Sequence, residues 1–403
     1  MSLPSGYKRL EYIKYSGTQY IDMGFKATQN TKIEVKFHNE QSANSAVFGA
    51  DKAWTQDAFG IWINNTIAVP VVGTVSGTIR VSYSSAYDTF TLDKNTLKLN
   101  GGTIWTASGV SAFQTPTNVC LGAVNRSGDV SEKFVGKMYY CKVWENGTLI
   151  RDFIPCQNRA GDVGMWDDVN SVFYGNAGTG TFMAGPVIAI AADASEITKL
   201  EYIQSNGTQY IDTGIVPKNN TRVDADCDIT YGTDWVMILG SYDPNKYFSW
   251  WANGAKIYAY YGTSNKNVAG ENGKQTLSAN KNIWTAGNSA ISFSEVSFTS
   301  NFSIYLFSVN NGGNYSKASM KLYSCQIYDN GTLVRDFIAA KLSDGTVGLY
   351  DKLNGLLYIN VGTGAFTAGP VVASPSIFVN INGIWKPINN IYVNINNIWQ
   401  KST

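Results

Sequence analysis

The chain has 403 residues, a formal net charge of +1 and only 15% charged residues. This balance excludes the basic footprint of a nucleic-acid-binding protein and the long acidic tail of a solvating segment. Aromatic residues reach 13%, with 24 Tyr and 11 Trp, and there are 39 Gly. Such a composition is typical of an all-β protein built from short strands and tight turns.

The amino terminus continues from Met1 directly into SLPSGYKRLEYI. No apolar stretch follows a basic start, so we expect no secretory signal. The longest apolar run near a boundary, residues 187–192, is far too short to cross a bilayer. The sequence therefore predicts a soluble chain without membrane insertion.

Alternation of apolar and polar residues predicts antiparallel strands. In NTKIEVKF, Ile33, Val35 and Phe37 share one face, and NTRVDADCDI at 220–229 repeats the pattern. Asn-Gly pairs at 100–101, 146–147 and 330–331 stand between strand-like segments and predict two-residue hairpin turns. No stretch of similar length has a helical period, so we expect little helix.

The chain is a tandem duplication. Residues 141–187 return as residues 325–371 with 24 of 47 positions identical, and LEYIKYSGTQYIDMG at 10–24 returns as LEYIQSNGTQYIDTG at 200–214 with 11 of 15 identical. The middles of the copies differ in length and composition. A shared framework with divergent loops is the pattern expected when loops carry recognition.

These boundaries predict two tandem jelly-roll β-sandwiches and a small carboxy-terminal module. The first sandwich takes residues 1–187 and the second takes residues 197–372, with a linker at 188–196. Residues 373–403 contain IFVNINGIW and IYVNINNIW, each of which predicts a strand, an Asn-rich turn and a second strand. Because an isolated hairpin is marginally stable in water, we expect this tail to pair with the second domain or with another subunit.

The motifs LPSGYKRLEYI, GTQYIDMG, NGTLIRDFIP and NAGTGTFMAGP resemble the laminin-G-like, concanavalin-A-like jelly-roll domains found in virion and tail proteins of bacteriophages and in related bacterial surface proteins. VNINGIWKPI in the tail is similar to the Asn-Gly-Trp-Lys repeats that close such phage proteins. The resemblance implies a virion protein assembled in the host cytoplasm, a partner among other virion proteins, and a homo-oligomer such as a trimer. Fold alone does not decide function, since lectins, glycosidases and structural modules share it.

Catalysis has little support in the sequence. The one histidine, His38, aligns with Asp228 in the second copy, which argues against a catalytic triad. Asp224, Asp226 and Asp228 share a strand face, yet the first copy has Lys36 in place of Asp226, which removes the acid pair of a glycosidase. We interpret the aspartates as a solvated face, with a Ca²⁺ site as the second interpretation, and expect a protein that is no enzyme and holds no cofactor.

Other polar motifs are interpreted as structural. Arg151 with Asp152 and Arg335 with Asp336 recur in both copies and predict ion pairs or turn hydrogen bonds. The cysteines form no C-x-x-C pair and are odd in number, so we expect reduced, buried thiols and no disulfide. They are Cys120, Cys141, Cys156, Cys227 and Cys325.

Aromatic residues in the divergent middles are the candidate ligand contacts. Sugar rings stack their apolar faces on Trp and Tyr, while Asn, Asp and Gln bond the hydroxyls. Alternation in YFSWWAN places Tyr247 and Trp251 on one face and Phe248 and Trp250 on the other. The candidate contacts are Trp54, Trp62, Tyr247, Trp250, Trp251, Tyr258 and Tyr260.

The sequence thus favours a non-enzymatic phage virion protein, of tail-fibre, head-fibre or receptor-binding type, that adheres to host-surface carbohydrate. A decoration or assembly protein of capsid or tail that binds no sugar is the first alternative. A bacterial surface adhesin is the next, and the expected lack of a secretory signal weighs against it. A glycan-degrading enzyme comes last.

Overall fold

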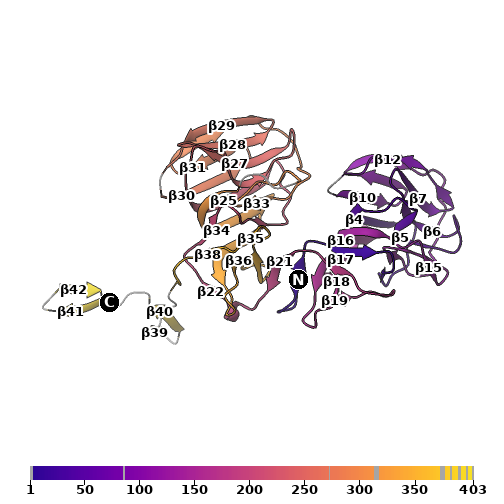
Figure 1. The fold of residues 1–403 in the computed structure, drawn as a ribbon, viewed down its shortest axis with the longest axis horizontal. Coiled ribbons are helices and arrows are strands. Elements are labelled where there is room, and N and C mark those ends of the chain that lie inside the picture. The colour runs from indigo at the N-terminus through magenta and orange to yellow at the C-terminus, as the bar shows by residue number, and fades with distance from the viewer. Residues whose placement is uncertain are drawn as a thin grey trace.

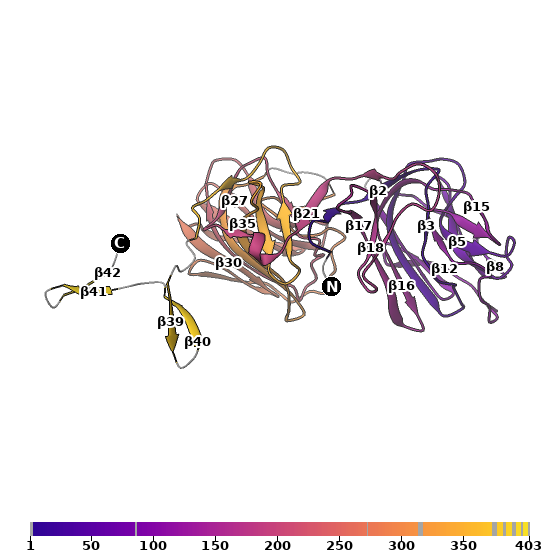
Figure 2. The same ribbon diagram turned by 90° about the horizontal axis from the view of Figure 1, so that it is seen from below.

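The computed structural model describes residues 3–401 except 85–86, 272, 313–316, 373–376, 382–383, 389–391 and 396–397. Two β-lobes follow one another along the chain, lobe 1 (residues 3–186) and lobe 2 (residues 198–372), and strand β21 lies between them (Figures 1 and 2). Among the described residues the single helical element is a 3-10 turn, η1 (Ala194–Glu196). The predicted all-β class is confirmed. No helix in the described part of the chain is long and apolar enough to span a membrane.

The large sheet of lobe 1 is built around β4, which pairs with β10 on one side and β16 on the other. Its burial alternates as the sequence predicts, since Ile33, Val35 and Phe37 are fully buried and the residues between them are not. The strands of this sheet are β1 (Lys8–Leu10), β2 (Ile13–Ser16), β4 (Thr31–Asn39), β10 (Asp88–Asp93), β11 (Thr96–Leu99), β12 (Gly102–Thr106), β16 (Val135–Glu145), β17 (Thr148–Gln157), β18 (Val163–Asp167), β19 (Val172–Tyr174) and β20 (Met183–Ala184).

The small sheet of lobe 1 covers the other side of that core. Phe48, Phe59 and Ile61 point inward and pack in one cluster with Phe37 and Phe90 of the large sheet. A lobe is therefore a sandwich of two sheets closed over an apolar layer. The strands are β3 (Ile21–Asp22), β5 (Ser45–Asp51), β6 (Ala58–Ile63), β7 (Ile67–Gly73), β8 (Val75–Ser76), β9 (Ile79–Arg80), β13 (Cys120–Leu121), β14 (Val124–Arg126) and β15 (Asp129–Ser131).

Lobe 2 repeats the large sheet in the same register. Val35 lies opposite Cys141 in lobe 1, and Ala225 lies opposite Cys325 in lobe 2, so the sequence repeat is also a repeat of strand pairing. The strands are β22 (Thr198–Lys199), β23 (Ile203–Asn206), β25 (Arg222–Ile229), β30 (Lys274–Asn280), β31 (Ile283–Ala286), β32 (Ser289–Ser292), β34 (Ser319–Asp329), β35 (Thr332–Lys341), β36 (Val347–Asp351), β37 (Leu356–Ile359) and β38 (Thr367–Ala368).

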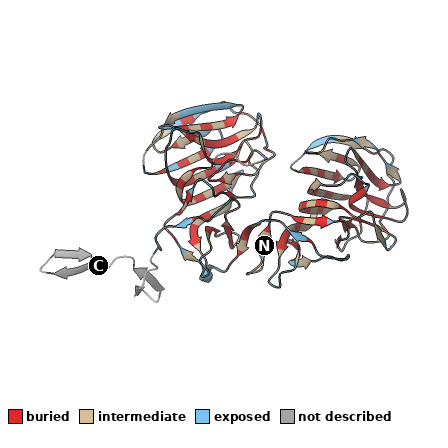
Figure 3. Ribbon diagram, in the orientation of Figure 1, coloured by how far each residue is buried: buried red, intermediate tan, exposed pale blue. Residues whose placement is uncertain are grey.

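The small sheet of lobe 2 has the order β24-β33-β26-β27-β28-β29. Buried residues alternate with partly exposed ones along its inner strands, whereas β29 at its edge is largely exposed (Figure 3). The strands are β24 (Ile211–Asp212), β26 (Val236–Ser241), β27 (Tyr247–Asn253), β28 (Lys256–Gly262), β29 (Ser264–Ala269) and β33 (Tyr305–Leu306).

The three Asn-Gly turns form as predicted. Asn146 and Gly147 between β16 and β17 have φ values of 49° and 81°, and Asn330 and Gly331 between β34 and β35 have 48° and 82°. A type I′ hairpin turn requires positive φ at both central residues, and its twist matches that of the two strands it joins.

The segment predicted as a linker, 188–196, contains a strand and a 3-10 turn. β21 (Val187–Ala191) pairs with β1 of lobe 1 through Arg9 opposite Ala189, and with β37 of lobe 2 through Ala189 opposite Tyr358. One strand therefore joins the two large sheets into a continuous ladder. The short apolar run at 187–192 pairs as a strand because an open sheet edge is available on each side.

The tail contains two hairpins, as its repeats predict. They are β39 (Ile377–Ile381) with β40 (Ile384–Ile388), and β41 (Tyr392–Ile395) with β42 (Ile398–Lys401). In the described residues each hairpin is a separate two-stranded sheet that shares no ladder with lobe 2. The expected pairing of the tail with another subunit stays a prediction.

Replacement of Ala192 by proline should loosen the connection between the lobes. The Ala192 N–H donates to the Gly355 carbonyl at 3.0 Å, and proline has no N–H to donate. We expect a loss of about 1–3 kcal/mol and a larger radius of gyration in small-angle scattering. Ala192→Ser keeps the N–H and is the control; identical scattering curves for the folded proline variant and the control would contradict the assignment.

Candidate functional site

The outer face of the small sheet in lobe 2 carries a continuous group of aromatic rings. Alternation along β27 directs Tyr247 and Trp251 outward, where both are half-buried, and Phe248 and Trp250 inward, where both are fully buried. On β28, Tyr258 and Tyr260 are also half-buried on the outer face, while Tyr261 is buried. The prediction of two opposite faces in YFSWWAN is confirmed.

Ring contacts join these side chains. Tyr242 stacks on Tyr247 with centroids 4.3 Å apart and an interplanar angle of 16°. Trp251 lies 4.7 Å from Tyr260, and Trp235 lies 4.6 Å from Tyr258. Trp235 is 43% exposed, an unusual exposure for so large an apolar side chain. We call the group the aromatic surface, and its members are Trp235, Tyr242, Tyr247, Trp251, Tyr258 and Tyr260.

Two asparagines border the aromatic surface. On edge strand β29, Asn267 lies opposite Tyr258 and Asn265 lies opposite Tyr260, so both amides share the outer face with the rings. Both are exposed. Sequence reasoning missed them, although the period of two in SNKNVA beside IYAYYG is a signal that could have found them.

Trp250 is a correction. It is 0% exposed and packs 4.9 Å from Trp284 in the core, so it cannot contact a ligand on the surface. The alternation shows that Trp250 and Trp251 face opposite ways, but it does not identify the face that meets the core. The sandwich decides this, because the large sheet lies on the Trp250 side.

Trp62 in lobe 1 is a second correction. Gly60 pairs with Gly49 in lobe 1, and Ser249 pairs with Gly240 in lobe 2, so Gly60 and Ser249 are equivalent positions. Trp62 and Trp251 each lie two residues after them and are therefore equivalent too. Trp62 is only 4% exposed, because the β14–β15 hairpin covers it. Val124 packs against its ring, and its indole N–H donates to the Glu132 carboxylate. Among the described residues of lobe 2 there is no hairpin equivalent to β14–β15 that would cover Trp251.

Trp54 is the exposed candidate in lobe 1. It is 46% exposed and makes an edge contact with Trp62, with centroids 5.0 Å apart. Beside it the outer-face positions of β7 are Val69 and Val71, where lobe 2 has Tyr258 and Tyr260. Among the described residues this face of lobe 1 carries the exposed ring of Trp54, whereas the same face of lobe 2 carries the aromatic surface.

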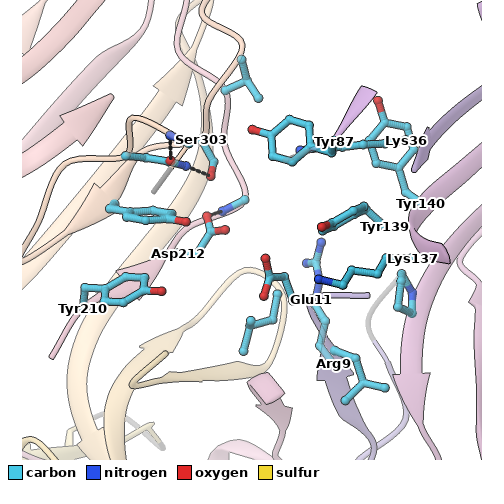
Figure 4. Close-up of a pocket in the computed structure, with 18 residues that line it drawn as sticks. Arg9, Glu11, Lys36, Tyr87, Lys137, Tyr139, Tyr140, Tyr210, Asp212 and Ser303 are labelled. Carbon is cyan, nitrogen blue, oxygen red and sulfur yellow. Dashed lines mark hydrogen bonds between the residues drawn. The ribbon is translucent and has the colours of Figure 1, made fainter. Parts of the chain in front are cut away.

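A cleft between the lobes is a second candidate site, with a volume of about 390 Å³. Figure 4 shows lobe 1 contributing Arg9, Glu11, Lys36, Tyr87, Lys137 and Tyr139 on one side and lobe 2 contributing Tyr210, Asp212 and Ser303 on the other. Tyr87 spans the cleft, since its hydroxyl donates to the Asn301 carbonyl at 3.1 Å. Nothing in the sequence relates these segments, since Tyr87 and Asn301 are 214 residues apart along the chain.

The aspartate face of β25 is occupied by partners within lobe 2. Arg222 lies 2.6 Å from Asp224, Lys274 lies 3.7 Å from Asp226, and Lys321 lies 3.5 Å from Asp228. Among the described residues no group of three or more His, Cys, Asp or Glu side chains could hold a metal ion. The aspartates form surface ion pairs rather than a cation cradle.

In the recurring Arg-Asp motifs, the arginine and the aspartate do not pair with each other but form ion pairs with other residues. Arg151 lies 3.5 Å from Asp167, and Arg335 lies 3.6 Å from the equivalent Asp351. Asp152 and Asp336 pair with Lys142 and Lys352. All five cysteines are buried free thiols, as predicted, and burial raises the pKa of Cys120 to about 12.

Comparison with known proteins gives structural similarity alone, because no family model and no curated protein matches the chain. Domains LG4–5 of the mouse laminin alpha1 chain are 10% identical over 93% of this chain and 96% of that chain, with a TM-score of 0.28. The LG1–3 region of the laminin alpha2 chain is 9% identical, over 82% and 63%, with a TM-score of 0.27. NanB sialidase from Streptococcus pneumoniae is 10% identical, over 94% and 86%, with 0.26. At these scores the assignment of two tandem sandwiches rests on the strand pairing described above.

Alanine substitutions of the two neighbouring tryptophans of β27 should differ in their effect on stability. Trp250→Ala empties a core site and should lower the free energy of unfolding by about 3–5 kcal/mol in urea denaturation. Trp251→Ala removes a half-buried outer ring and should cost about 1–2 kcal/mol, because part of its area is already in water. Equal losses for the two variants would contradict the assignment of the faces.

Proposed function

We propose that the chain is a non-enzymatic virion protein of a bacteriophage, of tail-fibre, head-fibre or receptor-binding type, that adheres to carbohydrate on the host surface. The observation that carries the sugar-binding part is the aromatic surface of lobe 2 with Asn265 and Asn267 at its border. The virion part is supported by the resemblance of the terminal motifs to phage domains. Other virion proteins and further copies of the chain are the partners that this role requires.

The aromatic surface suits a saccharide for two reasons. Half-buried Trp and Tyr rings offer flat apolar faces to the C–H face of a sugar ring, and a rigid sheet holds them in place at little entropic cost. The exposed amides of Asn265 and Asn267 can each donate to and accept from hydroxyl groups. Rings for stacking beside amides for hydrogen bonding form the combination that orients a sugar.

A decoration or assembly protein is the second candidate, and the same surface favours it. Exposed Trp and Tyr also form the centres of protein–protein interfaces. In that case the aromatic surface would be covered by another virion subunit and would bind no sugar. The two functions differ in what the isolated, folded chain binds.

Glycan binding should depend on the outer rings of lobe 2. Trp251→Ala and Tyr258→Ala should each weaken binding of the soluble chain to host cells or to a glycan array by about tenfold, since each removes one stacking ring. Leu353→Ala is the matched control, because Leu353 is an exposed apolar side chain elsewhere in lobe 2. Full glycan binding by the Trp251 and Tyr258 variants, or none by the folded wild type, would favour the assembly role.

The location in the particle is a separate expectation. Mass spectrometry of phage particles purified by density gradient should detect peptides from both lobes at a stoichiometry comparable to other tail or head appendage proteins. The unassembled lysate fraction serves as the comparison. Detection in host envelopes but not in particles would instead support a bacterial surface adhesin.

A further inference from the structure

We propose that the cleft between the lobes is a second binding site, separate from the aromatic surface, and that it takes an acidic saccharide whose carboxylate pairs with Lys36. The site is defined by Arg9, Glu11, Lys36, Tyr139, Asp212 and Tyr305. This inference does not depend on the sugar-binding role of the aromatic surface.

Lys36 is the central observation. Its amine lies 3.4 Å from the centre of the Tyr87 ring and 5.6 Å from that of Tyr139. No carboxylate or carbonyl oxygen of the described residues lies within ion-pair or hydrogen-bond distance of this amine. The three N–H donors of this largely buried ammonium are thus left for water or for an anion that enters the cleft.

The equivalent position in lobe 2 shows that the sheet itself does not require a lysine there. Tyr140 lies opposite Lys36 in lobe 1 and Ser324 lies opposite Asp226 in lobe 2, in the same register of the repeat. Asp226 is balanced by Lys274 at 3.7 Å and by the Thr276 hydroxyl at 2.6 Å. Lobe 2 therefore has a neutralised pair on this face, whereas Lys36 of lobe 1 faces the cleft with no ion-pair partner among the residues that the structure describes.

The charge of the cleft favours an anion with additional polar groups. Three cationic side chains, Arg9, Lys36 and Lys137, line it beside two carboxylates. Burial and the nearby Asp212 raise the pKa of Glu11, and both carboxylates line the same cleft as Lys36 (Figure 4). A simple anion would use the cations alone, but a sugar hydroxyl can also donate to Glu11 and Asp212.

The remaining walls fit a sugar ring. Tyr210 and Tyr305 of lobe 2 stack with centroids 4.8 Å apart and both line the cleft. The hydroxyl of Ser303 accepts from Asn310 at 3.1 Å and keeps its own proton to donate. The volume of about 390 Å³ lies in the range of small-ligand pockets and admits a short saccharide.

Titration calorimetry with two acidic probes and their neutral counterparts tests the proposal on the full chain. The pairs are trigalacturonic acid with its methyl ester, and sialyllactose with lactose. We expect at least one acid to bind and its neutral counterpart to bind about tenfold more weakly or not at all, because the ester or the missing acid removes a charge-assisted hydrogen bond. The proposal is overturned if neither acid binds, or if an acid and its neutral counterpart bind equally well. It is also overturned if acetate displaces the acidic probe as effectively as the unlabelled acidic saccharide does.

Two variants place the binding in the cleft. Lys36→Gln should weaken the acidic probe about tenfold, whereas Lys274→Gln should leave it unchanged. Lys274 is the matched control because its amine also lies over a tyrosine ring, 4.5 Å from the centre of Tyr323, but outside the cleft. In a Trp251→Ala background, Lys36→Gln should still weaken the acidic probe about tenfold, which separates this site from the aromatic surface. Unchanged affinity in Lys36→Gln would overturn the assignment.

The pH dependence supplies a further readout. Desolvation lowers the pKa of Lys36 to about 8, against the opposing effect of Asp212 and Glu11. A lysine is charged below its pKa, so binding of the acidic probe should be strong at pH 7 and weaken as the pH rises above about 8, with a smaller change in Lys36→Gln. The other charged or titratable groups that face the cleft are Arg9, Glu11, Tyr87, Lys137, Tyr139, Tyr140, Tyr210, Asp212 and Tyr305.

Discussion

The alternation of side chains along each strand is the constraint on which this structure depends. In a strand at the centre of a sandwich every second side chain lies in the core, and a substitution at one of these positions reduces the packing. The residues between them face outward and are free to differ. Lobe 1 and lobe 2 therefore share a buried pattern, as in Val35 and Ala225, while their outer faces have become unlike.

Two equivalent positions illustrate how far the outer faces have diverged. Trp62 and Trp251 occupy the same place in the small sheet, yet one lies beneath a hairpin and the other belongs to an open group of rings. Lys36 and Asp226 occupy the same place in the large sheet, yet one lies unpaired in a cleft and the other is neutralised. In both cases the framework is unchanged and the surroundings decide what the side chain can do.

The fold could be predicted from the sequence to a large extent, because it rests on local signals. Period-two burial predicted strands such as β4, and Asn146-Gly147 predicted its hairpin, since each depends on residues close together in the chain. The site was predicted only in part. Alternation identified Trp251 as a neighbour of opposite orientation to Trp250, but the side that meets the core depends on the other sheet.

The hairpin that covers Trp62 and the lobe 2 residues that line the cleft beside Lys36 come from segments distant in sequence, which no local pattern relates. The β14–β15 hairpin is about sixty residues from Trp62, and Asp212 is far beyond Lys36 along the chain. β21 was missed as a strand for a similar reason, since its apolar run is short and its partners β1 and β37 come from different copies. Tertiary context, not propensity, decided each of these points.

The shared strand also has a mechanical consequence. The hydrogen bonds of an antiparallel ladder run perpendicular to the strands, so tension directed along β21 loads several of them together in shear. A slack tether would instead lengthen under the same pull before transmitting it. A two-lobed chain built this way would pass force from one lobe to the other with little extension.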